Sequence, residues 1–146
     1  GSFRFISRSE VDLSRPRSEP GITYPVVEYA QPDPLFQSQS AITGVVVYRD
    51  DAIPQLEDLV LFGDFPSGEI FYIRADDLPD GGQDAIRRVL LRDRGESRTL
   101  LQLVQAQNTQ QGREPATRVD LRFGTGPGGR VFLLNKQDGV IREVVR

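Results

Sequence analysis

From residue 42 onward, the apolar residues come in short runs that are rich in β-branched and aromatic side chains. Glycine, proline or aspartate, which favour turns, stands between most of these runs. This texture is typical of consecutive antiparallel strands. We therefore expect an all-β fold with little helix. The expected strands lie near residues 43–48, 58–63, 69–74, 119–124, 130–135 and 140–145.

Two of the expected strands indicate which of their faces should be buried. Between residues 119 and 123, apolar side chains alternate with Asp120 and Arg122, which predicts one buried face. Residues 69–73 are apolar on both faces, which predicts a central strand that is covered on both sides. Residues 65–68 should form the turn that precedes this central strand.

The sequence pattern of residues 84–106 fits both a helix and strands. Some of their apolar residues fall at helical spacing, but residues 88–92 and 99–104 also suit strands. Turn-forming residues at 93–96 favour a hairpin, so we expect strands in both runs. The polar residues 107–117 should form a surface loop.

The first forty residues differ from the rest of the chain. Five of the ten prolines lie before residue 41, which disfavours helix there. We expect an extended, proline-rich N-terminal segment over residues 1–40 and a second unit over residues 41–146. Gly1 and Ser2, in a chain without methionine, are typical of the scar that cleavage of a purification tag leaves.

Composition excludes several classes of function. The formal net charge of −3 gives no broad cationic surface, so we expect no nucleic-acid partner. No apolar run approaches the roughly 20 residues that a membrane-spanning helix needs. The absence of cysteine excludes disulfides and thiolate metal sites, and the absence of histidine excludes a serine–histidine triad.

Residues 124–129 match the G-x-G-x-x-G pattern of pyrophosphate-binding turns. That pattern binds phosphate by delivering it to the N-terminus of a helix. Here it leads into residues 130–134, which suit a strand, so we expect an ordinary turn. Asp-Gly within residues 137–139 predicts a hairpin further on.

An acidic loop surrounds Leu78 and Pro79. Several carboxylates in one loop can bind a hard cation such as calcium. The spacing of these aspartates does not match an EF-hand, so we expect a solvated loop and assign no metal ligand. The aspartates concerned are Asp76, Asp77, Asp80 and Asp84.

Three stretches of the amino-acid sequence resemble one known family. They are Ala-Ile-Thr-Gly-Val-Val-Val-Tyr-Arg at 41–49, Leu-Phe-Gly-Asp-Phe-Pro-Ser-Gly-Glu-Ile-Phe at 61–71, and the glycine-rich run from Phe123 to Arg142. Together they resemble the C-terminal blades of the glucose/sorbosone dehydrogenase family. The resemblance covers residues from about 41 to 145, and its Gly-Asp-Phe-x-Ser-Gly block is the most specific part.

The resemblance implies a fold and a function. The fold is a six-bladed β-propeller of antiparallel blades, of which this chain would hold about two. The full-length parent protein would oxidise aldose sugars with pyrroloquinoline quinone and calcium in an extracytoplasmic compartment, either periplasmic or secreted. This chain alone would be non-catalytic and bind no cofactor. Its partners would be the remaining blades or other copies of itself. The alternative is a propeller without quinone chemistry that serves as a binding or interaction module.

The resemblance also implies where a quinone cofactor would bind. Relatives hold its carboxylates with a lysine in the turn that corresponds to residues 65–68, and with two arginines at the start of the last blade. Here the turn has no lysine, and Asp120 stands where the second arginine is expected. Arg118 is therefore the candidate cofactor-binding residue. The catalytic histidine of the relatives precedes this region, so we assign no catalytic residue.

Overall fold

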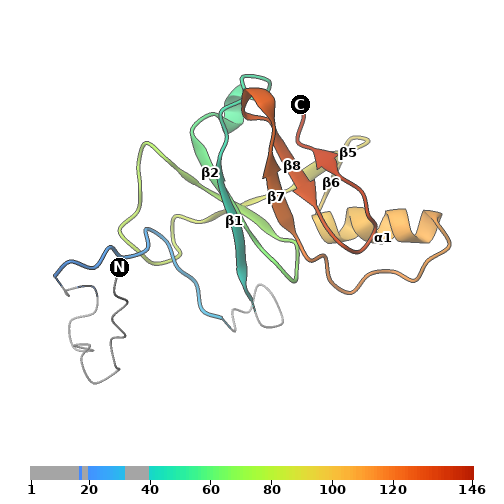
Figure 1. Cartoon of the computed structure of the whole chain (residues 1–146), viewed down its shortest axis with the longest axis horizontal. Coiled ribbons are helices and arrows are strands. Elements are labelled where there is room, and N and C mark those ends of the chain that lie inside the picture. The colour runs from blue at the N-terminus through green and yellow to red at the C-terminus, as the bar shows by residue number, and fades with distance from the viewer. Residues whose placement is uncertain (1–16, 18–19, 32–39) are drawn as a thin grey trace, which may run out of the picture.

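The computed structural model describes residue 17, residues 20–31 and residues 40–146 (Figure 1). Most of the expected N-terminal extended segment therefore lies outside the described residues. Within these ranges the structure consists mainly of antiparallel sheets with one α-helix. The expectation of a mostly β fold is confirmed. None of the described helices is long and apolar enough to cross a lipid bilayer.

The first sheet is a meander of four antiparallel strands in chain order. Its strands are β1 (Ile42–Val47), β2 (Leu59–Asp64), β3 (Ile70–Arg74) and β4 (Arg87–Val89). A short 3-10 helix, η2 (Pro54–Leu56), connects β1 to β2. A bulge between Thr43 and Val45 interrupts the β1–β2 register, and Gly44 there has a φ of 58°. Three predicted strands thus appear within about a residue of their expected positions.

A hairpin and a second sheet follow. The hairpin consists of β5 (Leu91–Asp93) and β6 (Glu96–Arg98), which confirms the turn predicted at residues 93–96. The second sheet has three antiparallel strands, β7 (Arg122–Thr125), β8 (Val131–Leu134) and β9 (Arg142–Glu143). The loop that joins β8 to β9 contains the Asp-Gly pair, as expected for a hairpin. The glycine-rich run before β8 forms a 3-10 turn, η3 (Pro127–Gly129), and leads into a strand.

The prediction of a strand at 99–104 is wrong, because these residues form the N-cap and the first part of the helix α1 (Leu100–Gln110). Thr99 caps its N-terminus in a capping box, in which the Gln102 N–H donates to Thr99 Oγ1 at 3.2 Å and Thr99 N–H donates to Gln102 Oε1 at 2.9 Å. Leu100, Val104 and Asn108 lie at four-residue spacing and are buried. The helix also takes in the first part of the loop predicted at 107–117.

The strand predicted at 119–124 begins only at Arg122, because Asp120 has a φ of 59°. A left-handed residue cannot continue an extended strand. Residues 119–121 bond instead to the turn between β2 and β3: Val119 N–H donates to Pro66 O at 2.8 Å and Leu121 N–H donates to Phe65 O at 2.9 Å. The predicted burial is nevertheless correct for Val119 and Leu121, which are fully buried.

The apolar residues of the 119–123 segment pack directly over three glycines, two in strands of the first sheet and one in the turn between β2 and β3. A Cβ atom added to any of these glycines would come within 2.6 Å of the side chain above it. The pairs are Val119 over Gly68, Leu121 over Gly63 and Phe123 over Gly44. The two sheets can approach closely here because the first sheet has no side chains at these positions.

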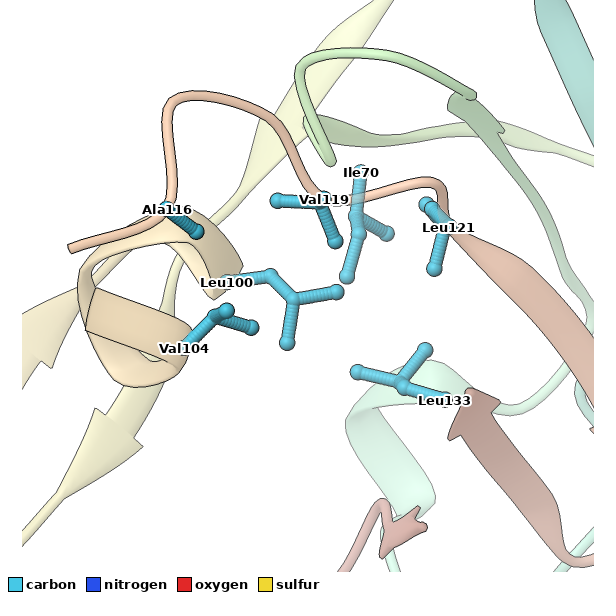
Figure 2. Close-up of a cluster of buried hydrophobic side chains, with 7 residues drawn as sticks. All are labelled: Ile70, Leu100, Val104, Ala116, Val119, Leu121 and Leu133. Atoms are coloured by element: carbon cyan, nitrogen blue, oxygen red, sulfur yellow. The ribbon is translucent and has the colours of Figure 1, made fainter. Parts of the chain in front are cut away.

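The main core fills the space between the two sheets and α1. Figure 2 shows side chains from β3, α1, the 116–121 segment and β8 that converge there. They are Ile70, Leu100, Val104, Ala116, Val119, Leu121 and Leu133. A neighbouring cluster of Tyr48, Leu59, Leu61 and Val131 extends this layer.

The opposite face of the first sheet is covered by the N-terminal segment. Val27 and Tyr29 pack against the buried Phe62 and Phe71, on the side of the sheet that lies away from α1 (Figure 1). The segment is also held through its backbone to the loop before β4, since Glu28 N–H donates to Gly82 O at 2.9 Å. Strand β3 is therefore central and covered on both sides, as predicted.

Candidate functional site

The candidate site is built on the turn between β2 and β3, and the buried carboxylate of Asp64 holds that turn in place. Asp64 Oδ2 accepts hydrogen bonds from Ser67 N–H at 2.9 Å and from Ser67 Oγ at 2.5 Å. Its Oδ1 accepts a bond from Ala41 N–H at 2.7 Å, which ties the start of β1 to the same turn. The Asp64 side chain is completely buried. The turn therefore presents Phe65 from a fixed backbone.

Two arginines lie against the Phe65 ring. The guanidinium carbon of Arg122 is 4.1 Å from the ring centroid, and that of Arg118 is 5.5 Å from it. Both distances are within the range of cation–π attraction. Arg122 is also fixed by its Nη1, which donates to Thr43 Oγ1 at 3.1 Å and to Leu121 O at 3.0 Å. We call Phe65, Arg118, Asp120 and Arg122 the arginine cluster.

Asp120 occupies the middle of the arginine cluster. Its Oδ1 accepts a hydrogen bond from Arg118 Nε at 2.6 Å, and its Oδ2 accepts one from Gln137 Nε2 at 2.8 Å. The Asp120 side chain is only 13% exposed, so this carboxylate is held in its position. It neutralises much of the charge that Arg118 would otherwise offer to an anionic ligand.

The residues of the arginine cluster do not fit the role in binding pyrroloquinoline quinone that the resemblance implies. A tricarboxylate needs several uncompensated cations, and a fixed carboxylate among them repels it. Arg118 is already paired with Asp120, and the turn offers Pro66 and Ser67 where the family that the sequence resembles has a lysine. Unlike Arg118, Arg122 has no carboxylate partner in the described part of the chain.

The cluster is suited to binding. Guanidinium groups remain protonated near neutral pH, so Arg118 and Arg122 do not serve as proton-transfer groups. A guanidinium on an aromatic ring does present a planar, cationic surface that fits a single carboxylate or a polar ring edge. Half of the Arg118 side chain is exposed, which leaves the cluster open to such a ligand.

The sequence identified Arg118 alone, and the structure adds the residues around it. Phe65 and Arg122 were missed as site residues because they are far apart in the chain, and nothing in the local sequence indicates that they meet. The sequence did contain one indication, because Arg118 and Arg122 lie on either side of Asp120. The left-handed turn at Asp120 accompanies the placement of both arginines against the Phe65 ring.

Two carboxylates of the acidic loop before β4 form ion pairs. Asp76 accepts a bond from Arg74 at 2.5 Å, and Asp80 lies 3.5 Å from the guanidinium of Arg17. Among residues 20–31 and 40–146, no three acidic side chains converge in a way that could hold a metal ion.

A second buried carboxylate organises the β8–β9 loop. Asp138 Oδ1 accepts bonds from Asn135 Nδ2 at 2.8 Å and from Val140 N–H at 2.9 Å, and its Oδ2 accepts one from Arg142 Nη2 at 2.5 Å. Burial alone would raise the pKa of Asp138, but the bonds from Arg142, Val140 and Asn135 outweigh it and place that pKa below its ordinary value.

Asp138 should therefore make the fold sensitive to acid. A carboxyl with a lowered pKa in the folded state stabilises the fold above its unfolded-state pKa of about 4, and that contribution is lost as the pH falls through the folded-state pKa. We expect Asp138→Asn to lower the free energy of unfolding at pH 7 by on the order of 1 kcal/mol. In the variant, this free energy should also depend less on pH below about 4.

Urea denaturation of the wild type and the variant at a series of pH values measures this effect. Asp77→Asn, at an exposed position in the acidic loop, removes the same charge and serves as the control. Parallel pH profiles for wild type and Asp138→Asn would contradict the assignment.

Comparison of the chain with protein-family models, with curated proteins and with solved structures finds no match.

Proposed function

We propose that this chain is the C-terminal part of a glucose/sorbosone dehydrogenase-like β-propeller, contributing about two blades and no catalytic group. The first sheet is a meander of four antiparallel strands and the second a meander of three. The two sheets pack face to face, with β1 beside β7 (Figure 1). Successive propeller blades have this meander topology and this mode of packing.

The observation that carries the proposal is the contact between the 65–68 turn and the 118–122 segment. These are the two segments that the resemblance places around the cofactor of the relatives. They are distant in the chain, yet backbone bonds from Val119 to Pro66 and from Leu121 to Phe65 join them. The quinone relatives would use this place to bind a ligand, which supports a ligand-binding role for the arginine cluster.

Two activities of the full-length parent protein follow from this assignment. The resemblance implies oxidation of aldose sugars with pyrroloquinoline quinone and calcium, outside the cytoplasm. The pairing of Arg118 with Asp120 favours the alternative, a propeller that binds a ligand or partner without quinone chemistry. We take the binding role as the function that the geometry supports best.

Titration of pyrroloquinoline quinone into the chain in the presence of calcium tests this choice. We expect no binding by equilibrium dialysis up to about 1 mM, and no dye-linked oxidation of glucose above a protein-free control. Asp120→Asn removes the carboxylate, and asparagine tolerates the left-handed backbone at this position. This variant should bind the quinone about tenfold more tightly than the wild type.

Asp50→Asn, at a partly exposed position away from the cluster, makes the same change in net charge and should leave quinone binding unaltered. Tight binding by the wild-type chain would instead favour the quinone-dependent parent. An Asp120→Asn variant that gains no affinity would show that the cluster is not the quinone-binding place.

A further inference from the structure

A groove of about 570 Å³ shares no lining residue with the arginine cluster. It runs between the β5–β6 hairpin, the second half of α1 and the C-terminal residues that include β9 (Figure 1). Its volume is in the range of sites that bind small molecules or short peptide segments.

Strand edges form two walls of this groove. All of residues 91–95 line it, and so do all of residues 142–146. Within these runs, β5 covers residues 91–93 and β9 covers residues 142–143. Side chains of a strand alternate between its two faces, so a cavity that touches every residue of a strand lies along the edge of that strand. In the described part of the chain, β5 pairs only with β6 and β9 only with β8. The groove is therefore flanked by an unpaired edge on each side.

The second sheet is one strand shorter than the first. The first sheet has a fourth strand, β4, next to β3, whereas the described second sheet ends at its third strand, β9. Unpaired N–H and C=O groups along an edge are a template for another extended segment. Strand addition of this kind is a common way in which sheets bind peptides.

The charges of the groove favour an acidic occupant. Arg92 and Arg94 line it, and neither forms an ion pair with any described residue. Arg98 also lines it and is paired with Glu96 at 2.7 Å. The acidic lining residues are Glu143, which is engaged by Arg130 at 3.5 Å, and Asp93, which forms no ion pair with a described residue. The unpaired Arg92 and Arg94 outnumber the unpaired Asp93, so the rim keeps an excess of positive charge in a chain whose net charge is −3.

Part of the lining of the groove is apolar. Side chains from β5, α1, β8 and the C-terminal residues line it between the arginines. These are Leu91, Leu103, Ala106, Leu133, Val140 and Val144. An added strand would direct alternate side chains toward this lining and toward the rim, so it should alternate apolar and acidic residues.

We propose that the groove between β5 and β9 binds an extended peptide segment of alternating apolar and acidic residues, which adds as a strand to the free edge of β9. Backbone hydrogen bonds to β9 supply affinity that does not depend on sequence. Arg92 and Arg94 select acidic side chains, because charge-assisted bonds from guanidinium to carboxylate are strong and geometrically specific. This binding is independent of any ligand at the arginine cluster.

Fluorescence polarisation with a labelled peptide of about nine alternating valine and glutamate residues tests the proposal. We expect saturable binding below about 1 mM and slower amide exchange at residues 142–146 in the complex. A lysine–valine peptide of the same length should bind about tenfold more weakly. A version with proline at alternate positions cannot donate backbone hydrogen bonds and should also lose binding.

Charge reversal in the chain provides the complementary test. Arg92→Glu combined with Arg94→Glu should weaken binding of the valine–glutamate peptide about tenfold or more. Arg49→Glu combined with Arg74→Glu changes the net charge equally at exposed positions outside the groove, and should leave the affinity unaltered.

Several results would overturn the proposal. One is the absence of binding by the valine–glutamate peptide up to about 1 mM. Equal binding by the proline version would refute strand addition, and equal binding by the Arg92→Glu/Arg94→Glu variant would refute the charge selection. Light scattering that shows a dimer disrupted by that same double variant would identify a second copy of the chain as the occupant instead.

Discussion

Asp64→Asn should be among the most destabilising single substitutions in this chain, lowering the free energy of unfolding by about 3 kcal/mol. The Asp64 carboxylate is completely buried and accepts bonds from Ala41 N–H, Ser67 N–H and Ser67 Oγ. Asparagine replaces one acceptor oxygen with an N–H₂ group. One backbone N–H would then face another donor, buried and without a partner.

Asp50→Asn is the matched control for this substitution. Asp50 is near the surface, and its Oδ1 accepts a single bond from Ala52 N–H at 3.0 Å, which the oxygen of asparagine can accept equally well. We expect a change within about 0.5 kcal/mol. Urea denaturation followed by circular dichroism measures both variants. Equal unfolding midpoints would show that Asp64 does not hold the β2–β3 turn.

The second large effect is expected at Gly63, where alanine should lower the free energy of unfolding by about 2–3 kcal/mol. A Cβ at this position would lie 2.5 Å from Leu121 Cδ2 and 3.0 Å from the backbone oxygen of Glu69. The leucine is fully buried and the Glu69 oxygen belongs to the neighbouring backbone. Moving the leucine would separate its segment from the first sheet, and moving the Glu69 oxygen would break the hydrogen bond that it accepts from Asp64 N–H at 2.9 Å.

Gly124→Ala tests whether this effect depends on the close approach of the sheets. Gly124 also lies in a strand, and its nearest neighbour to an added Cβ is the end of the Leu134 side chain at 3.2 Å. Because this methyl group can shift, alanine should be neutral or slightly stabilising here, by up to about 1 kcal/mol. If Gly63→Ala and Gly124→Ala gave the same stability, the packing of Leu121 over Gly63 would not limit the sheet separation.

Some features of the fold could be predicted because they depend on local sequence. The strands of the first sheet follow from β-branched and aromatic runs between turn residues, and the 93–96 hairpin follows from its Arg-Gly turn. Helix α1 was missed, although Thr99 and Gln102 form a capping box that could have indicated its start. Its apolar residues suit a strand equally well, so the cap was the deciding signal.

The sequence by itself determined the mostly β character, the positions of the first three strands of the first sheet, and the burial of Val119 and Leu121. Alternation and turn chemistry act between neighbours in the chain, so they can be read without a structure. Only the tertiary structure decided that Asp120 takes a left-handed conformation and that the 118–122 segment bonds to the 65–68 turn. The arginine cluster depends on these contacts between segments that are distant in the chain, and no local pattern specifies which segments meet.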